Sequence, residues 1–172
     1  MKNREWYEDS IQTILCECLP QLPKSNIRPA YSKSKLINPF AKNHVDGSDS
    51  MKDGMHKIKN TDNVVYFWLH FDPLDLLSTE ISDTVSAVIP FRLTISCYGI
   101  DSMPIAIRLK AFMRTEGVLY RMLGMNATLS HEPTLTTFEE ELQGEWWERT
   151  DVDIGMNVLV DDFFEGDKAA AG

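Results

Sequence analysis

The sequence predicts an α+β fold: a single domain over residues 1–165, in which a mostly antiparallel sheet is packed by an N-terminal helix and one long central helix. Residues 85–97 and 152–160 alternate between apolar and polar side chains, and residues 105–123 carry apolar side chains at helical spacing. Helices and strands do not alternate as a repeating βαβ fold requires. A long loop near residues 38–62 and a flexible tail over residues 166–172 complete the predicted organisation.

The segment 85–97 gives the strongest strand signal. Its odd positions are all apolar and predict one packed face: Val85, Ala87, Ile89, Phe91, Leu93, Ile95 and Cys97. Tyr98 and Gly99 end the strand. Asp101 and Ser102 are placed to cap a following helix, which tolerates Pro104 only in its first turn.

That helix is predicted to run for about five turns. Its apolar positions lie 4, 3, 7 and 4 residues apart and trace one stripe: Ile105, Leu109, Phe112, Leu119 and Leu123. Gly124 is well placed to end the helix, because glycine adopts the backbone conformation that follows a last turn at little cost.

The N-terminal part of the chain supplies a helix and a short strand. Residues 5–19 predict an amphipathic helix that Pro20 and Pro23 close, since proline cannot continue the hydrogen-bond ladder. Residues 27–32 predict a strand, and Pro29 assigns it to a sheet edge or a bulge. The apolar face of the helix is formed by Tyr7, Ile11, Ile14, Leu15 and Cys18.

Several further segments are predicted to be extended. Residues 64–71 carry bulky side chains on both faces, which is typical of a central strand covered on both sides. A connector follows over residues 73–84, with Leu74 and Leu77 favouring a helical turn. The remaining strands are expected over residues 127–132, 134–142 and 152–160.

Bulk properties exclude several classes of protein. The net charge of −9 argues against nucleic-acid binding by the chain as a whole. Cys16, Cys18 and Cys97 are odd in number and lack zinc-ligand pairing, so reduced packing residues are expected. The absence of a basic-plus-apolar leader and of an apolar run of ~18 residues predicts a cytosolic protein with no membrane partner.

The sequence shows no clear pattern of a catalytic or metal-binding site. The four histidines fall on different predicted elements without ligand spacing. A two-metal site at Asp161 and Asp162 would need further carboxylates that converge on it and usually a lysine, and the sequence does not assign residues to these roles. There is no glycine-flanked nucleophile turn or phosphate-cradling glycine loop. We therefore expect no enzyme activity, no metal and no cofactor.

Charge is distributed unevenly along the chain. Residues 24–60 hold eight basic and three acidic side chains, a net +5, whereas residues 132–167 hold one basic and twelve acidic side chains, a net −11. Two interpretations stay open. Either these are two solvated faces, or one segment meets the other on a neighbouring copy in a head-to-tail contact that closes a ring.

Trp146 and Trp147 are neighbours in an extended segment, so their rings point to opposite faces. One ring can then pack inward while the other stays available for a protein interface, beside Glu145, Glu148 and Arg149. The alternative is that both rings cover the local core.

Two short phrases and the helix between them form a distinctive combination. Residues 95–102 (ISCYGIDS) end a strand just before the main helix, which carries Ala106, Ile107 and Arg108. Residues 147–154 (WERTDVDI) begin the closing strand with an aromatic, an acid and an arginine. Together these pieces resemble the neck and tail terminator proteins of long-tailed bacteriophages, and the similarity covers about residues 60–162 and the element order of the whole chain.

The resemblance implies a structural protein of the virion, assembled in the bacterial host cytoplasm. Members of the family form rings, commonly hexamers, that sit on the last ring of the tail tube, stop its growth and face the head-side connector. The implied partners are other copies of the chain, the tail-tube protein, the connector and viral DNA that passes through the lumen without specific binding. An acidic wall suits such a lumen, because basic walls hold DNA through counter-ion release.

Two sets of residues follow as hypotheses. At the subunit or tube interface we expect Lys42, Lys52, Lys57, Lys59, Trp146, Trp147 and Arg149. In or beside the lumen we expect Glu139, Glu140, Glu141, Glu145, Asp161 and Asp162. The alternatives are a head-completion or connector adaptor of the phage neck, and an unrelated α+β protein-binding module.

Overall fold

The strand predicted from the alternation over residues 85–97 forms the middle of the sheet. In the computed structural model, which describes residues 4–32, 35–36, 62–71, 77–81, 84–142 and 145–160, β6 (Thr84–Tyr98) lies between β4 (Val64–Phe71) and β9 (Glu145–Val160). The strand order is β1-β4-β6-β9-β7, with β5 also paired to β6 and β8 also paired to β9. Among the described strand pairs of this sheet, only β1 and β4 run parallel, so the predicted mostly antiparallel sheet is confirmed.

The remaining strands are short or peripheral, apart from β8. The members of the main sheet are β1 (Ile27–Pro29), β5 (Leu77–Ile81), β7 (Ala127–Leu129) and β8 (Thr134–Leu142). A separate two-stranded sheet consists of β2 (Tyr31–Ser32) and β3 (Lys35–Leu36). Pro29 lies on the edge strand β1, as its missing backbone donor requires.

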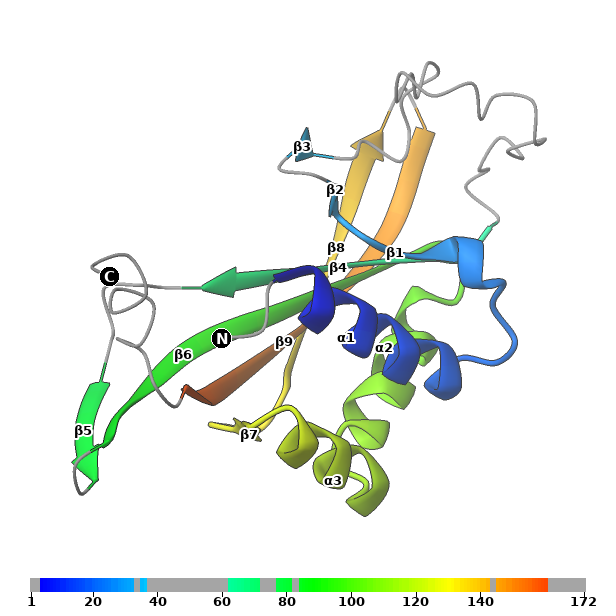
Figure 1. Ribbon diagram of the computed structural model, residues 1–172. Coiled ribbons are helices and arrows are strands. Elements are labelled where there is room, and N and C mark those ends of the chain that lie inside the picture. The colour runs from blue at the N-terminus through cyan, green and yellow to red at the C-terminus, as the bar shows by residue number, and fades with distance from the viewer. Residues whose placement is uncertain are drawn as a thin grey trace, which may run out of the picture.

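The three α-helices pack on one face of the sheet (Figure 1). They are α1 (Arg4–Cys18), α2 (Ser102–Phe112) and α3 (Glu116–Gly124), and a single 3₁₀ turn spans Lys24–Asn26. We call this the helix face of the sheet and the opposite side the open face. The predicted α+β class is therefore confirmed, and the N-terminal helix lies within one residue of its expected bounds.

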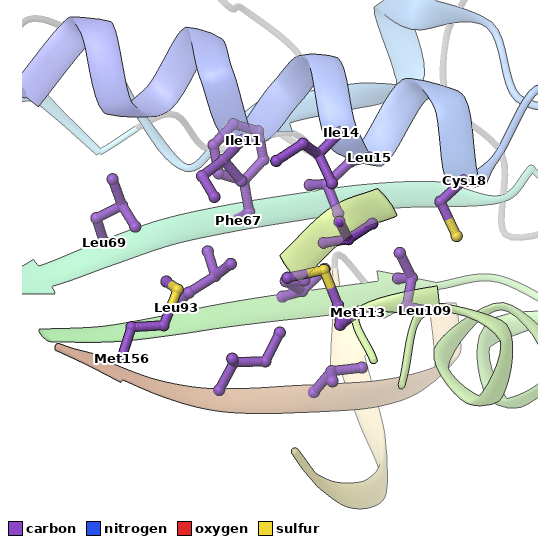
Figure 2. Close-up of a cluster of buried hydrophobic side chains, with 14 of the residues drawn as sticks. Ile11, Ile14, Leu15, Cys18, Phe67, Leu69, Leu93, Leu109, Met113 and Met156 are labelled. Atoms are coloured by element: carbon purple, nitrogen blue, oxygen red, sulfur yellow. The ribbon is translucent and has the colours of Figure 1, made fainter. Parts of the chain in front are cut away.

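Alternation along the strands directs the large side chains to the helix face. Figure 2 shows Ile11, Ile14 and Leu15 of α1 pointing toward Phe67 and Leu69 of β4. The same buried cluster continues across β6 and β9 to the two other helices, through Leu93, Leu109, Met113, Ile154 and Met156. Cys18 and Cys97 are buried here as free thiols and Cys16 is partly buried, which confirms the prediction of reduced packing residues.

A smaller cluster covers part of the open face. It consists of Ala30, Val64, Tyr66, Tyr98 and Trp147, with Trp68 packed against it. Because Val65 and Phe67 belong to the helix-face cluster, β4 is covered on both sides at this end, as its two bulky faces predict.

The prediction of one long helix over residues 105–123 is wrong. Thr115 adopts an extended backbone with ψ 146°, and its hydroxyl donates a 2.8 Å hydrogen bond to the carbonyl of Phe112, so the segment divides into α2 and α3. The break resets the helical phase, and Val118 and Met122 pack inward in place of Leu119 and Leu123, which are exposed. The seven-residue gap in the apolar spacing conceals this break, since it fits an uninterrupted helix equally well.

Other boundaries differ from expectation for local reasons. The connector predicted over residues 73–84 contains β5, in which Leu77 pairs with β6 and so is not helical, while Leu74 lies outside the described residues. Asp101 occupies the N-cap position of α2, yet its carboxylate accepts a 2.8 Å hydrogen bond from the Asn63 amide and makes no side-chain cap. Gly124 is the last residue of α3, while the left-handed conformation falls on Asn126, with φ 55°. Residues 38–61 of the predicted loop and the predicted tail over residues 166–172 lie outside the described residues.

Candidate protein interface

The end of the β8–β9 pair extends beyond the rest of the sheet. Pairing between β6 and β9 stops at Tyr98 and Arg149, whereas β8 and β9 stay paired out to Leu142 and Glu145. We call the paired residues 139–142 and 145–148 the arm; in Figure 1 it rises away from the helices. Because successive strand residues alternate, the arm presents Trp146 on one face, whereas Trp147 on the other face is buried in the open-face cluster.

The helix-side face of the arm surrounds an exposed tryptophan with carboxylates. Trp146 is 66% exposed and lies opposite Glu141, and Glu139 lies directly opposite Glu148. All three glutamates are exposed, although Glu148 also accepts a 3.0 Å hydrogen bond from the Ser102 hydroxyl. Like charges facing each other across two strands destabilise the pair, so the isolated chain carries an unrelieved repulsion here.

The other face of the arm continues into a bonded network centred on Arg149. Its Nε and Nη2 donate to the two carboxylate oxygens of Asp151 at 2.8 and 2.7 Å, and its Nη1 donates to Glu140 at 3.2 Å. The guanidinium carbon lies 5.0 Å from the ring centre of Phe138 and 5.5 Å from that of Tyr98. The network therefore ties β6, β8 and β9 together on the open face.

The network shifts the ionisation of its members. Burial raises the pKa of Tyr98 well above its usual range; Arg149 opposes that shift and the negative charge of Glu140 adds to it. Burial acts to lower the pKa of Arg149, but hydrogen bonds to Asp151 and Glu140 and the nearby Tyr98 raise it overall. The arginine is therefore a permanent cation whose charge is balanced inside the chain.

A second exposed apolar surface lies on α3. Tyr120 and Leu123 are 77% and 57% exposed, and Leu119 beside them is 37% exposed. The basic side chains of the same two helices and of the turn between them are paired within the chain: Lys110 and Arg114 contact Glu132 at 3.8 and 3.0 Å, and Arg121 contacts Glu17 at 2.6 Å. We call these residues of α2 and α3, with Arg114 between the helices, the α2–α3 surface.

Among the residues predicted from the sequence as interface or lumen residues, those that the structure describes do not form one cluster. Trp147 is buried and Trp146 exposed, as the alternation predicts, and Arg149 bonds within its own chain. Glu139 and Glu141 lie on one face of the arm and Glu140 on the other, because successive strand residues alternate. The backbone of Glu145 belongs to β9. Lys42, Lys52, Lys57, Lys59, Asp161 and Asp162 lie outside the described residues.

Sequence reasoning missed several residues that build these surfaces. Phe138 and Asp151 complete the Arg149 network, and the cross-strand register that brings them there is not visible in the sequence. The prediction of one continuous helix placed Leu123 on the packed stripe and gave no reason to expect an exposed apolar surface at Tyr120 and Leu123. The signal for them was Thr115 followed by Glu116 and Gly117, a combination typical of a helix start.

Two general findings concern the described residues. Within those ranges, every helix is too short or too polar to cross a membrane. In the same ranges, no three side chains among His, Cys, Asp and Glu gather as a metal site would need.

Comparison with known proteins agrees with the fold and with the two sequence phrases. The family model described as phage neck terminator protein matches residues 9–169, which include β4, β6, all of α2 and α3, and the arm. Comparison with curated proteins gives no match. The resemblance noted from residues 95–102 and 147–154 is thus confirmed. The chain belongs to the phage neck terminator protein family, and it is a structural component of the virion neck that contacts other head or tail components.

Proposed function

We propose that copies of this chain form a ring, of six subunits by analogy with the family, that caps the tail tube, ends its polymerisation and joins it to the head-side connector. The observation that carries the proposal is the family match over residues 9–169. The proposal makes the surfaces of the protein, not a reactive group, responsible for its function.

The shape of the chain supports a ring. A ring of identical subunits needs two different surfaces on each subunit, because each copy contacts one neighbour with one surface and the next neighbour with the other. Among the exposed large apolar side chains of the described residues, Trp146 lies on the arm and Leu119, Tyr120 and Leu123 lie on α3, while Ile100 and Ile107 are exposed before and on α2.

We also propose that part of the acidic segment 132–167 lines or adjoins a channel for DNA. Of its twelve acids, those that neither pair with a base of the chain nor lie at a subunit contact would supply a wall that repels phosphates, whereas a basic wall would release counter-ions and bind the DNA. Replacing Asp161 and Asp162 with lysine is expected to slow DNA ejection from particles. The reduction in the ejection rate should be smaller at high salt, because salt screens the attraction between lysine and phosphate. Ejection that is unaffected at low salt would remove these two residues from the channel.

The experiment that tests the capping role mixes the purified chain with polymerising tail-tube protein. Light scattering after size exclusion gives the mass of the chain alone, and electron microscopy gives the length and the ends of the tubes. A terminator is expected to form a ring on one tube end and to narrow the length distribution. Binding to the isolated head-side connector, without any effect on the tubes, would instead identify a connector adaptor.

A further inference from the structure

We infer that the arm of one subunit docks on the α2–α3 surface of the next copy of this chain. The inference rests on the proposed ring and names the two surfaces that close it. The occupant of the α2–α3 surface is thus a second copy, which inserts Trp146 against Leu119, Tyr120 and Leu123.

The two surfaces cannot meet within one chain. The strand β9 passes from Trp146 in the arm to Asn157, which pairs with β7 beside α3. Eleven residues of strand span about 36 Å, at roughly 3.3 Å per residue. Figure 1 likewise shows the arm and α3 at opposite ends of the molecule. Any contact between them therefore joins two copies head to tail, and repetition of that contact with rotation closes a ring.

Charge favours this pairing over a contact between two arms or between two helix surfaces. The arm, residues 139–142 and 145–148, holds five acids and no base, whereas the α2–α3 surface holds three bases, Lys110, Arg114 and Arg121, beside two acids of the same chain, Glu132 and Glu17. Identical surfaces would repel each other, whereas the arm and the α2–α3 surface attract. The existing pairs do not block the contact: both members of the Arg114–Glu132 pair are 60% exposed, and such pairs are weak and easily exchanged.

Docking also removes an electrostatic repulsion that is present in the isolated chain. Glu139 faces Glu148 across the strands with no basic side chain bonded to either among the described residues. A lysine or arginine from the neighbour placed near this pair would convert the repulsion into an attraction. The aromatic ring of Trp146 would form the desolvated centre of the contact, and the acids around it would form the polar rim. Stable interfaces commonly have this arrangement.

Cysteine cross-linking tests the pairing directly. The variant Glu141→Cys with Leu123→Cys, which keeps Trp146, is assembled on tail tubes and oxidised. We expect a ladder of covalent oligomers that ends at the ring size. The matched control, Glu141→Cys with Asp9→Cys, places the second thiol on an exposed position of α1 and is expected to give no ladder above the wild-type background. Capped tubes without a ladder would overturn this pairing and leave the ring intact, whereas wild-type protein that stays monomeric beside uncapped tubes would overturn the proposed function itself.

A charge exchange tests the pairing without new thiols. The variant Glu139→Lys with Glu141→Lys is expected to need at least tenfold more protein to cap tubes. Adding Lys110→Glu and Arg114→Glu to the same chain should restore most of the loss, because both sides of the contact are then reversed. Unchanged capping by the first variant, or failure of the four-fold variant to recover although its melting temperature stays within a few degrees of wild type, would contradict the inference.

Discussion

Arg149 and Asp151, two residues apart on β9, form a two-pronged ion pair with N–O distances of 2.8 and 2.7 Å. The side chain of Asp151 is only 10% exposed and also accepts a 2.5 Å hydrogen bond from the Ser96 hydroxyl. The pair therefore lies at the seam between β6 and β9, just where the arm leaves the sheet. This geometry accounts for Trp147, Arg149 and Asp151 in the phrase at residues 147–154, because each of the three is packed or bonded on the open face. Glu148 between them lies on the helix side, where it accepts the hydrogen bond from Ser102.

Arg149→Ala is expected to lower the free energy of unfolding by about 2–3 kcal/mol, because it leaves the buried carboxylate of Asp151 without its cation. Arg149→Lys keeps the charge but loses the two-pronged geometry, and should recover only part of this loss. The control Arg114→Ala removes an exposed pair and should cost less than about 0.5 kcal/mol. Urea unfolding of the three variants measures the differences, and equal losses for Arg149→Ala and Arg114→Ala would refute the structural role of the network.

Gly99 between β6 and α2 is expected to tolerate no side chain. Its φ is +110°, and a Cβ there would lie 2.5 Å from the backbone oxygen of Asp62. Gly99→Ala should therefore cost about 2–4 kcal/mol of unfolding free energy. Gly117→Ala is the matched control, because a Cβ at this helical position meets nothing within 4 Å and should stabilise the protein by about 0.5–1 kcal/mol. Thermal melts of both variants give the comparison, and a neutral Gly99→Ala would mean that the turn has another conformation.

Substitutions of the two adjacent tryptophans are expected to have different effects, one on the stability of the fold and the other on assembly. Trp147→Ala empties part of the buried cluster on the open face and should cost about 3–5 kcal/mol. Trp146→Ala removes an exposed ring and should change the unfolding free energy by no more than about 0.5 kcal/mol, while it impairs capping of tail tubes. Calorimetry and the tube assay, run on the same samples, distinguish the two. A stable Trp146→Ala variant that caps tubes normally would exclude Trp146 from the interface.

Alkaline solution is expected to destabilise the fold through its buried thiols. Burial raises the pKa of Cys18 from its ordinary value near 9 to about 11, an effect that Arg108 opposes, and burial also raises the pKa of Cys97. Because the unfolded thiol ionises first, the stability is fully present below pH 9 and is lost as the pH rises from 9 toward 11. Cys18→Ala should make this slope shallower by up to about one proton, or ~1.4 kcal/mol per pH unit. The control Ile14→Val also removes core volume from α1 but changes no ionisable group, so it should keep the wild-type dependence of stability on pH.

The elements that sequence reasoning predicted well are those in which a single period covers the whole segment. The alternation of Leu93, Ile95 and Cys97 fixed which face of β6 is packed, and that of Ile154, Met156 and Val158 did the same for β9. The helix break at Thr115 was missed because the apolar residues on either side fit one stripe. The strand β5 was missed because it is extended through its pairing with β6, and the local residue pattern does not reveal this tertiary contact.

The candidate interface was predictable only in part. That Trp146 and Trp147 face opposite ways follows from alternation alone. Which of them is exposed depends on the cluster around Tyr66 and Tyr98, which β4 and β6 supply from distant parts of the sequence. The bonding of Arg149 to Glu140 likewise depends on the register of β8 against β9, which the sequence does not reveal.

The central claim, that this chain is a self-associating cap for the tail tube, is tested most directly by electron microscopy of tail tubes polymerised with and without it. The account predicts a ring on one end of each tube and a narrow length distribution. Tubes of unregulated length, beside protein that stays monomeric by light scattering, would contradict it.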